Sequence, residues 1–432
     1  MLKNCSAVKQ FMIPFSVFEE WTSYAKEIHL KPRHIDIERL LSNSNIKIVG
    51  ISGIRRCGKS SLLMLAFRNV AAKGKKACYL YLEDGRIKNE KDALDQLIKW
   101  FGDEGFLFLD EITNISGWED WLSRMHEQTK GKLRIITSSS RGGIATPQKP
   151  LRGRILNFDL YPLSFTEFLE FKGVSPKFTT AGIGDLEKNL EEYLIYGGFP
   201  EIALTEDKTD KVRIINSYFK DIIALDIAEI TSIDINAVEL FAKYILESTY
   251  FSASKCLNFY KSVGYKIGKE KILSLEWHSQ AAYLFFFMPI FSYNIKNETQ
   301  YPRKCYAGDT GLLYSVSGKK DMGRLYENAV FLELKRRLKP NEELNYWKNK
   351  DGNEVDFVIL EGTKPREIIQ VAYNLDDEKT KKRELSALVK AAKEFSLKKG
   401  MIVTHNIEDS KSFEGIQVKF IPLWKWLLEK SS

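Results

Sequence analysis

The sequence of 432 residues predicts an α/β protein whose core is a parallel sheet covered by helices on both faces. Two observations predict this fold. Short apolar runs without polar alternation are separated by helical stretches, at residues 46–51, 77–82, 106–109 and 133–137. In addition, a turn containing glycine joins the first of these runs to a helix with apolar periodicity, which is the strand–loop–helix order of an α/β unit.

The composition is that of an ordinary globular protein. Hydrophobic residues make up 44% of the chain and charged residues 28%, and at roughly 100–200 residues per domain the length allows about two to four domains. The net charge of +8 fits nucleic-acid binding and equally fits a solvated surface. The five cysteines form no CxxC pair and the five histidines are dispersed, which argues against a zinc site and a disulfide framework.

We predict no targeting segment and no membrane span. The N-terminal stretch Met1–Phe15 lacks the long apolar core of a signal peptide. The most apolar run, Ala281–Phe291, is shorter than the about 20 residues that a spanning helix needs. We therefore expect a cytoplasmic protein, in which Ala281–Tyr293 forms a buried apolar hairpin.

The chain is expected to begin with a helical segment at 1–31, followed by an α/β domain at 32–160. Each element of this domain follows from apolar content and flanking breakers. The predicted order is strand Ile46–Ile51, helix Ser60–Val70, and strands Ala77–Leu82, Phe106–Leu109 and Leu133–Thr137.

After Leu163 the apolar period becomes helical, and the last third returns to mixed α/β. The predicted helices of the middle part are Ser164–Lys172, Leu186–Ile195 and Val212–Ile230. The predicted elements of the last part are helix Leu325–Leu338, strands Val355–Leu360 and Glu367–Ala372, helix Asp376–Phe395 and strand Met401–Thr404.

The run Gly53–Ser61, GIRRCGKSS, matches G-x-x-x-x-G-K-[ST] without a gap. A phosphate chain needs a ring of backbone N–H donors, and glycines allow the loop to curl that tightly. We expect Lys59 to reach the β- and γ-phosphates of ATP and the Ser60 hydroxyl to ligate Mg²⁺. The predicted nucleotide-binding residues are Gly53, Arg55, Arg56, Cys57, Gly58, Lys59, Ser60 and Ser61.

A carboxylate pair follows the apolar run Phe106–Leu109. Asp110 is predicted to hold Mg²⁺ through its water shell, and Glu111 to polarise the attacking water. With Lys59 they are the predicted catalytic residues. The alternative for Glu111 is a surface carboxylate near a helix start.

Polar and basic residues follow the next strand. Thr137 or Ser138 is a candidate sensor that would hydrogen-bond the γ-phosphate or the water, and a serine-rich loop without a role is the alternative. Candidates for an arginine finger, acting in cis or from a neighbouring subunit, are Arg141, Arg152 and Arg154. For each of these arginines the alternative is an ordinary surface residue.

The ordered set of motifs resembles the prokaryotic AAA-type ATPases, common in archaea, that carry a C-terminal domain of unknown function with a restriction-endonuclease-like core. The resembling segments are GIRRCGKSS, FLFLDEI, TSSSR, LRGRILNFDLYPLSFTEFL, YLIYGGFPE, KCYAGDTGLL, GRLYENAVFLEL and NEVDFVI. The resemblance covers essentially the whole chain after its first thirty or so residues. It implies an adenine nucleotide, and it implies a P-loop ATPase core at 32–160, a helical lid at 161–232, a winged-helix-like region at 233–320 and a restriction-endonuclease-like domain at 321–432.

The winged-helix-like region contains a helix–turn–helix pattern, with helix starts at Phe251–Ser254 and Lys269. Its basic residues are Lys261, Lys266, Lys269 and Lys271. A recognition helix would place such side chains on the phosphates or in the major groove of double-stranded DNA. A winged helix that contacts protein, with solvated lysines, is the alternative, and the sequence leaves both open.

The C-terminal domain has a degenerate nuclease pattern. The pattern requires a helical Glu, an Asp, and then Glu-x-Lys on the next strand, so that two carboxylates hold Mg²⁺. Here Glu327 and Asp356 are present, but Gln370-Val371-Ala372 stands in place of Glu-x-Lys. Because a neutral amide anchors Mg²⁺ poorly, we expect the fold without the nuclease chemistry. Nothing in the sequence requires Lys348 or Lys350 to move into this site.

Three functions are compatible with these motifs. The first is a Mg²⁺-dependent ATPase that acts as a switch or motor on DNA or on a protein partner, and intact Asp110 and Glu111 favour it. The second is an ATP-regulated nuclease, which the missing Glu-x-Lys disfavours. The third is a nucleotide-dependent scaffold with negligible turnover. The sequence leaves an oligomer open.

Overall fold

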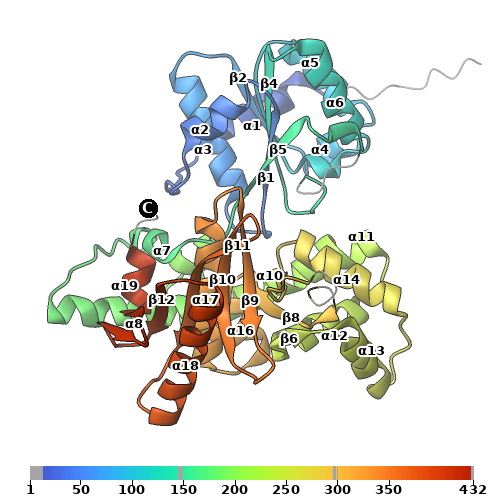
Figure 1. Ribbon diagram of the computed structural model, residues 1–432. Helices are drawn as coiled ribbons and strands as arrows, with labels where there is room; N and C mark the ends of the chain where they lie inside the picture. Colours follow the sequence, from blue (N-terminus) through green and yellow to red (C-terminus); the bar gives the residue numbers. More distant parts are fainter. Residues whose placement is uncertain (1–12, 145–148, 295–297, 299, 430–432) are drawn as a thin grey trace, which may run out of the picture. The chain divides into compact units, whose positions relative to one another are not determined.

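The computed structural model describes residues 13–144, 149–294, 298 and 300–429 (Figure 1). The first compact unit runs to Gly53 and continues over Gly58–Leu160. The second unit comprises Ile54–Cys57 and the chain from Tyr161 onward. The expected α/β fold class is confirmed. Of the predicted N-terminal helical segment, residues 1–12 lie outside the described residues.

The core of the first unit is a five-stranded sheet in the order β2-β3-β4-β1-β5, with every neighbouring pair parallel. The predicted parallel sheet is therefore confirmed. The strands are β1 (Ile48–Ser52), β2 (Ala77–Tyr81), β3 (Gly105–Asp110), β4 (Leu133–Ser139) and β5 (Ile155–Asp159). The sequence did not predict β5, because this edge strand is only partly buried and its apolar residues form no continuous run.

Helices cover both faces of this sheet. On one face α3 (Lys59–Ala72) packs against β3, where the Phe67 and Phe108 rings meet edge to face at 5.9 Å. Leu107 and Leu109 of β3 belong to the core on the other face, with residues of α5 and α6. The remaining helices of the unit are α1 (Phe15–Glu27), α2 (Ile37–Asn43), α4 (Gly85–Lys88), α5 (Ala93–Phe101) and α6 (Trp118–Thr129).

The strand order decides which residues meet at one edge of the sheet. Strand β4 lies between β1 and β3. Because parallel strands end at the same edge, the end of β3 at Asp110 lies near the end of β4 and near the start of α3. This edge holds the functional candidates of the first unit.

The second unit begins with helices, as the sequence predicts. They are α7 (Phe165–Phe171), α8 (Thr180–Tyr196), α9 (Pro200–Leu204), α10 (Lys208–Asp221), a π-helical segment (Ile222–Ala228) and α11 (Glu229–Thr231). The predicted continuous helix Val212–Ile230 is therefore three joined segments, with a π-helical turn pattern in its centre.

A small antiparallel sheet follows, with strand order β6-β8-β7. Its elements are α12 (Ile235–Glu247), β6 (Tyr250–Phe251), α13 (Ala253–Ser262), α14 (Lys269–Ala281), β7 (Phe285–Met288) and β8 (Arg303–Ala307). The predicted hairpin Ala281–Tyr293 is wrong, because this apolar run contains only β7, and its partner β8 lies after Tyr293.

The last part of the chain forms a six-stranded mixed sheet in the order β13-β14-β12-β11-β10-β9. The predicted strands and helices of this part are present, and β9, β13, β14, α16 and α19 are additional. The elements are α16 (Thr310–Ser317), α17 (Met322–Arg337), β9 (Glu342–Lys348), β10 (Glu354–Glu361), β11 (Lys364–Ala372), α18 (Glu378–Glu394), β12 (Lys399–Thr404), β13 (Asp409–Phe413), β14 (Ile416–Pro422) and α19 (Leu423–Leu428). Across the described residues, no helix is both long and apolar enough to cross a membrane.

A buried aspartate connects two of the motifs in the second unit. Asp309 accepts hydrogen bonds from the backbone N–H of Gly198 (2.8 Å) and of Gly311 (2.9 Å), and burial raises its pKa to about 7. Gly197, which ends α8, has a φ of +81°, and a Cβ added there would lie 1.6 Å from Asp309 Oδ1. Only glycine fits this contact without displacing the carboxylate.

We predict that Gly197→Ala destabilises the second unit by about 2 kcal/mol or more. Alanine is unfavourable in the left-handed backbone conformation of this position, and its Cβ would also clash with Asp309. The matched control is Gly184→Ala in the same helix, where no atom lies within 4 Å of the added Cβ. That control is expected to gain about 0.5–1 kcal/mol from helix propensity. Urea unfolding of both variants measures the difference, and equal midpoints would contradict the proposed close contact.

Candidate functional site

The start of α3 is built to receive an anion. Gly58 is the N-cap residue of α3, with a φ of +102°, and as a glycine it has no side chain that could cap this helix end. The first N–H groups of a helix have no partner within the helix, and together with the helix dipole they attract negative charge. Such a helix start has the kind of backbone donors that bind phosphate groups in proteins, and a nucleotide contact at Gly58 stays a prediction.

Lys59 places a cation at this helix start. Its side chain is only 4% exposed. Its Nζ donates to the carbonyl of Gly53 at 3.0 Å and lies 3.7 Å from Glu111 Oε1. The ammonium is thus held between the loop and a carboxylate that the sequence predicted to be catalytic.

Asp110 is fully buried at the end of β3 and is surrounded by hydroxyl groups. It accepts hydrogen bonds from Tyr79 Oη at 2.9 Å, from Ser138 Oγ and from the Ser60 side chain. Burial and the neighbouring Glu111 raise the pKa of Asp110, while the three hydroxyl donors act in the opposite direction. The two residues predicted to share Mg²⁺, Ser60 and Asp110, are therefore in direct contact.

Glu111 follows in a left-handed conformation, with φ 56° and ψ 50°. Its Oε2 accepts from the Ser140 N–H at 3.0 Å and from the Ser140 hydroxyl at 3.2 Å, and its own N–H donates to Ser138 Oγ at 3.0 Å. A left-handed non-glycine residue costs on the order of 1–3 kcal/mol and is often found at active sites. The loop after β4 thus fixes the orientation of Glu111.

The two candidate sensor residues have different surroundings. Thr137 Oγ1 donates to the carbonyl of Leu109 at 2.6 Å, so its hydroxyl bonds to the sheet backbone. The Ser138 hydroxyl instead connects Asp110 with the backbone of Glu111. Ser138 is the one of the pair that contacts the carboxylates, and its sensor role stays a prediction.

The candidate arginine fingers lie at different places in the first unit. Arg154 pairs with Glu127 at 2.8 Å and also donates to the carbonyl of Pro150 at 3.0 Å. Arg152 is exposed, and the backbone N–H of Arg141 donates to Ser139 Oγ at 2.9 Å. The role of each as a finger stays a prediction.

Arg55 and Arg56 belong to the second unit, and their side chains contact helices of that same unit. Arg55 donates from Nε to Asp226 Oδ2 at 2.9 Å and from Nη2 to Asp226 Oδ1 at 2.7 Å, and the Asp226 side chain is fully buried. The Arg56 guanidinium lies 5.6 Å from the centre of the Tyr218 ring. Cys57 is buried, and Ser61 is partly buried at the start of α3. Their nucleotide contacts stay predictions.

Sequence reasoning missed Tyr79, Ser140 and Asp226. Tyr79 lies inside an apolar strand, and only the pairing of β2 with β3 brings it to Asp110. Ser140 belonged to a serine run whose members cannot be ranked without the loop geometry. Asp226 lay within an expected helix and gave no separate signal.

The residues of the predicted degenerate nuclease pattern, Glu327, Asp356 and Gln370, lie in one cluster of the second unit. Asp356 N–H donates to Gln370 Oε1 at 3.1 Å, and Lys304 Nζ contacts both Asp356 (2.7 Å) and Glu327 (3.0 Å). Lys348 contacts Glu354 at 2.9 Å. The described ranges contain no group of three or more His, Cys, Asp or Glu residues arranged to hold a metal ion.

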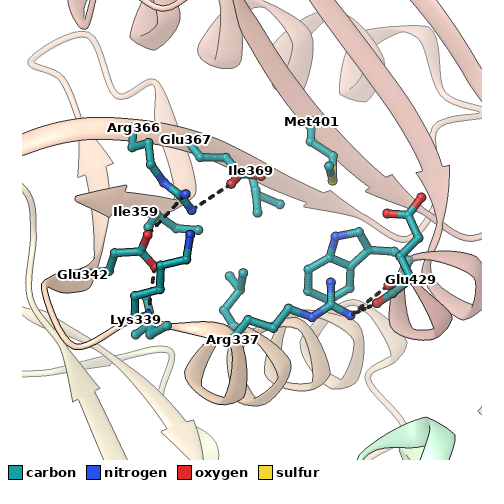
Figure 2. A pocket seen from close by; sticks show the side chains of 12 residues that line it. Arg337, Lys339, Glu342, Ile359, Arg366, Glu367, Ile369, Met401 and Glu429 are labelled. Atoms are coloured by element: carbon teal, nitrogen blue, oxygen red, sulfur yellow. Dashed lines mark hydrogen bonds and ion pairs between the residues drawn. The ribbon is translucent and has the colours of Figure 1, made fainter. Parts of the chain in front are cut away.

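A separate cavity of about 290 Å³ lies on the six-stranded sheet between α17 and α19 (Figure 2). The charged side chains that line this cavity interact with other lining residues. Arg366 lies 3.2 Å from Glu342, and Arg337 donates to the carbonyls of Trp426 and Glu429 at 3.0 and 3.1 Å. None of the degenerate nuclease residues lines it, so this cavity is distinct from that cluster.

Comparison with protein families divides the chain into three matched segments. Residues 45–169 match the family described as an AAA domain. Residues 187–323 and 322–426 match two domains of unknown function, DUF8612 and DUF4143. The AAA match contains the whole candidate site of the first unit.

Two uncharacterized proteins are similar over nearly their full length. One, from Methanocaldococcus jannaschii, is 35% identical over 436 residues, covering 95% of this chain and 95% of the relative. The other, from Haemophilus influenzae, is 27% identical over 395 residues, covering 87% of this chain and 93% of the relative. Among solved structures, a Walker-type ATPase of Pyrococcus abyssi overlaps with a TM-score of 0.44 and 14% identity, covering 68% of this chain and 99% of that chain.

We predict that Tyr79→Phe lowers stability by about 1–3 kcal/mol, because it removes one donor from the fully buried carboxylate of Asp110. Tyr81→Phe on the same strand is the matched control. It removes a bond to the partly exposed Glu83 and should cost less than about 1 kcal/mol. Chemical unfolding of the full chain compares the two, and an equal or larger loss in the control would refute the prediction.

Proposed function

We propose that this chain, which belongs to the same family as its Methanocaldococcus jannaschii relative and matches an AAA domain over residues 45–169, binds ATP with Mg²⁺ and hydrolyses ATP. One observation carries this proposal. Lys59, Ser60, Asp110 and Glu111 converge at one sheet edge, at the start of a helix whose N-cap residue is Gly58. In this proposal Lys59 donates hydrogen bonds to the phosphates, and Glu111 is the carboxylate base. Ser60 and Asp110 are the two Mg²⁺ ligands.

Each side chain has a defined part in this proposal. The backbone at Gly58 and the ammonium of Lys59 bind the phosphates, which requires Lys59 to release the carbonyl of Gly53. Ser60 and Asp110 are the residues that would hold Mg²⁺. Mg²⁺ bound there would neutralise negative charge that develops on the phosphates during transfer.

Glu111 is the proposed general base. Ser140 holds Oε2 through two hydrogen bonds, so the carboxylate is oriented before substrate arrives. Oε1 faces Lys59 at 3.7 Å, which places the carboxylate beside the residue proposed to bind the γ-phosphate. A water between these groups would be aligned for attack and would give its proton to Glu111.

The working partner is proposed to contact the region 233–320. The element order α12–β6–α13–α14–β7–β8, with its small antiparallel sheet, supports a winged-helix assignment. Four lysines in and around α13 and α14 are exposed, as DNA backbone contact requires: Lys261, Lys266, Lys269 and Lys271.

A protein partner is the second candidate, and a specific observation favours it. Leu273 and Trp277 lie one turn apart on α14 and are 44% and 51% exposed. An apolar pair of this size on a proposed recognition helix is typical of protein contact. Both partners are compatible with a nucleotide-driven switch.

The other two functions have less support. A nuclease needs an acidic residue and a lysine where Gln370 and Ala372 stand. A scaffold without turnover gives no reason for Ser140 to orient Glu111. Hydrolysis therefore accounts for more of the observed contacts.

We predict that Glu111→Gln lowers Mg²⁺-dependent ATP turnover at least about 100-fold, because an amide cannot accept the proton of the attacking water. Nucleotide binding should persist in this variant and should weaken at least about 10-fold in Lys59→Ala, which loses the phosphate cation. Glu104→Gln is the control, since Glu104 is an exposed carboxylate just before the opposite end of β3.

Turnover is measured with and without duplex DNA, alongside fluorescent-nucleotide binding. Stimulation by DNA that is lost when Lys269 and Lys271 become glutamine supports the DNA partner. Stimulation unaffected by those changes, or no stimulation, shifts the search to a protein that binds at Leu273 and Trp277. Bound nucleotide without turnover under all conditions would replace the ATPase by the scaffold.

A further inference from the structure

A second carboxylate cluster surrounds Lys304 of β8. The Lys304 side chain is 3% exposed. Its Nζ lies 2.7 Å from Asp356 Oδ1, 2.9 Å from Glu354 Oε1 and 3.0 Å from Glu327 Oε1. These are the lengths of charge-assisted hydrogen bonds. An ammonium has three N–H donors, so each donor has its own carboxylate.

The cluster keeps this lysine charged. Burial alone would lower the pKa of Lys304, but Asp356, Glu327 and Glu354 outweigh burial and raise the pKa well above its ordinary value. Glu327 and Asp356 also have further partners, on the same oxygen that contacts Lys304 in Glu327 and on the other oxygen in Asp356. Tyr306 Oη donates to Glu327 at 2.7 Å, and the backbone N–H of Val371 donates to Asp356 Oδ2 at 2.9 Å.

The divalent ion of a nuclease does not fit this arrangement. Mg²⁺ binds carboxylate oxygens at about 2.0–2.1 Å, and it would need the space that Lys304 Nζ fills between Glu327 and Asp356. Gln370 offers no replacement ligand. Its Oε1 accepts from Asp356 N–H at 3.1 Å and its Nε2 donates to Glu384 at 2.6 Å, so both ends of the amide are engaged.

We propose that this cluster is a cation site which the chain fills with its own Lys304 ammonium, so that the C-terminal domain binds no divalent ion until Lys304 is removed. Glu327, Glu354 and Asp356 remain in place as ligands for that ammonium. Without it, the three carboxylates would repel one another and would bind Mn²⁺ or Mg²⁺ from solution.

The filled site also joins two parts of the second unit. Lys304 comes from the three-stranded sheet, while Glu327 belongs to α17 and Asp356 to β10 of the six-stranded sheet. Tyr250 of β6 adds a hydrogen bond to Glu354. Buried ionic groups of this kind fix one relative arrangement of the elements they connect, because any other arrangement leaves a charge unpaired. The cluster around Lys304 therefore connects the three-stranded sheet to α17 and β10.

The test uses the full chain without nucleotide, so that the P-loop contributes no metal binding. Mn²⁺ binding is followed by electron paramagnetic resonance and thermal unfolding is measured with and without Mn²⁺. We expect wild type to bind no Mn²⁺ at this cluster. Lys304→Ala should unfold on the order of 10 °C lower, bind one Mn²⁺, and recover part of the lost stability when Mn²⁺ is added.

Two variants separate this effect from a general change of charge. Lys348→Ala removes an ammonium that also contacts Glu354 but is 40% exposed, and it should neither shift unfolding by more than about 2 °C nor create a Mn²⁺ site. Adding Asp356→Asn to Lys304→Ala should abolish the new Mn²⁺ site, because it removes one of its ligands.

Wild-type Mn²⁺ binding that disappears on Asp356→Asn would overturn the proposal, since the ammonium would then leave room for a metal ion. A folded Lys304→Ala chain that binds no Mn²⁺ would overturn it as well. If Lys304→Ala does not fold, Mn²⁺ binding by wild type and by Asp356→Asn alone tests whether the cluster excludes a metal ion. Supercoiled plasmid incubated with wild type and Mg²⁺ is expected to stay intact.

Discussion

A carboxylate buried at the end of a strand must be surrounded by donors or by cations, and the first unit is organised around this requirement at Asp110. Its donors come from three elements: Tyr79 from β2, Ser138 from β4 and Ser60 from α3. These elements are neighbours only because the strand order places β4 between β1 and β3. The same order brings the start of α3 and Glu111, the proposed base, to one edge. The proposed nucleotide site thus follows from the topology of the sheet.

The same requirement is met in the second unit in another way. The cluster of Glu327, Glu354 and Asp356 carries three carboxylates, and hydroxyl donors alone could not offset that charge. Here the chain supplies Lys304 as the cation. At Asp110 the donors are neutral, so under the proposed function the negative charge of Asp110 would be offset by an ion that arrives with the nucleotide. The first site could take a cation from solution, whereas the second is filled by the ammonium of a lysine side chain of the same protein.

The sequence was sufficient for features that depend on local pattern. The strand–loop–helix order around residues 53–61, the apolar strand before Asp110, and most helices of the second unit follow from spacing and turn residues, and the structure confirms these elements. Features that depend on pairing were not predictable. Tyr79 looks like any core residue until β2 is paired with β3, and Lys304 looks like a surface lysine until β8 lies beside α17 and β10. The hairpin error has the same origin, since apolar content does not identify a strand's partner.

The absence of Glu-x-Lys at Gln370–Ala372 and the position of Lys304 are consistent with each other in the proposed site. In the pattern, the lysine two residues after the glutamate stands beside the metal, and the glutamate helps to hold that metal. Once glutamine replaces the glutamate, Glu327 and Asp356 still repel each other but bind a divalent ion more weakly. A lysine from β8 relieves that repulsion permanently and needs no ion from solution. In this proposal an internal ion network connects these elements without a metal ion, and the chemistry proposed for the chain lies at the P-loop.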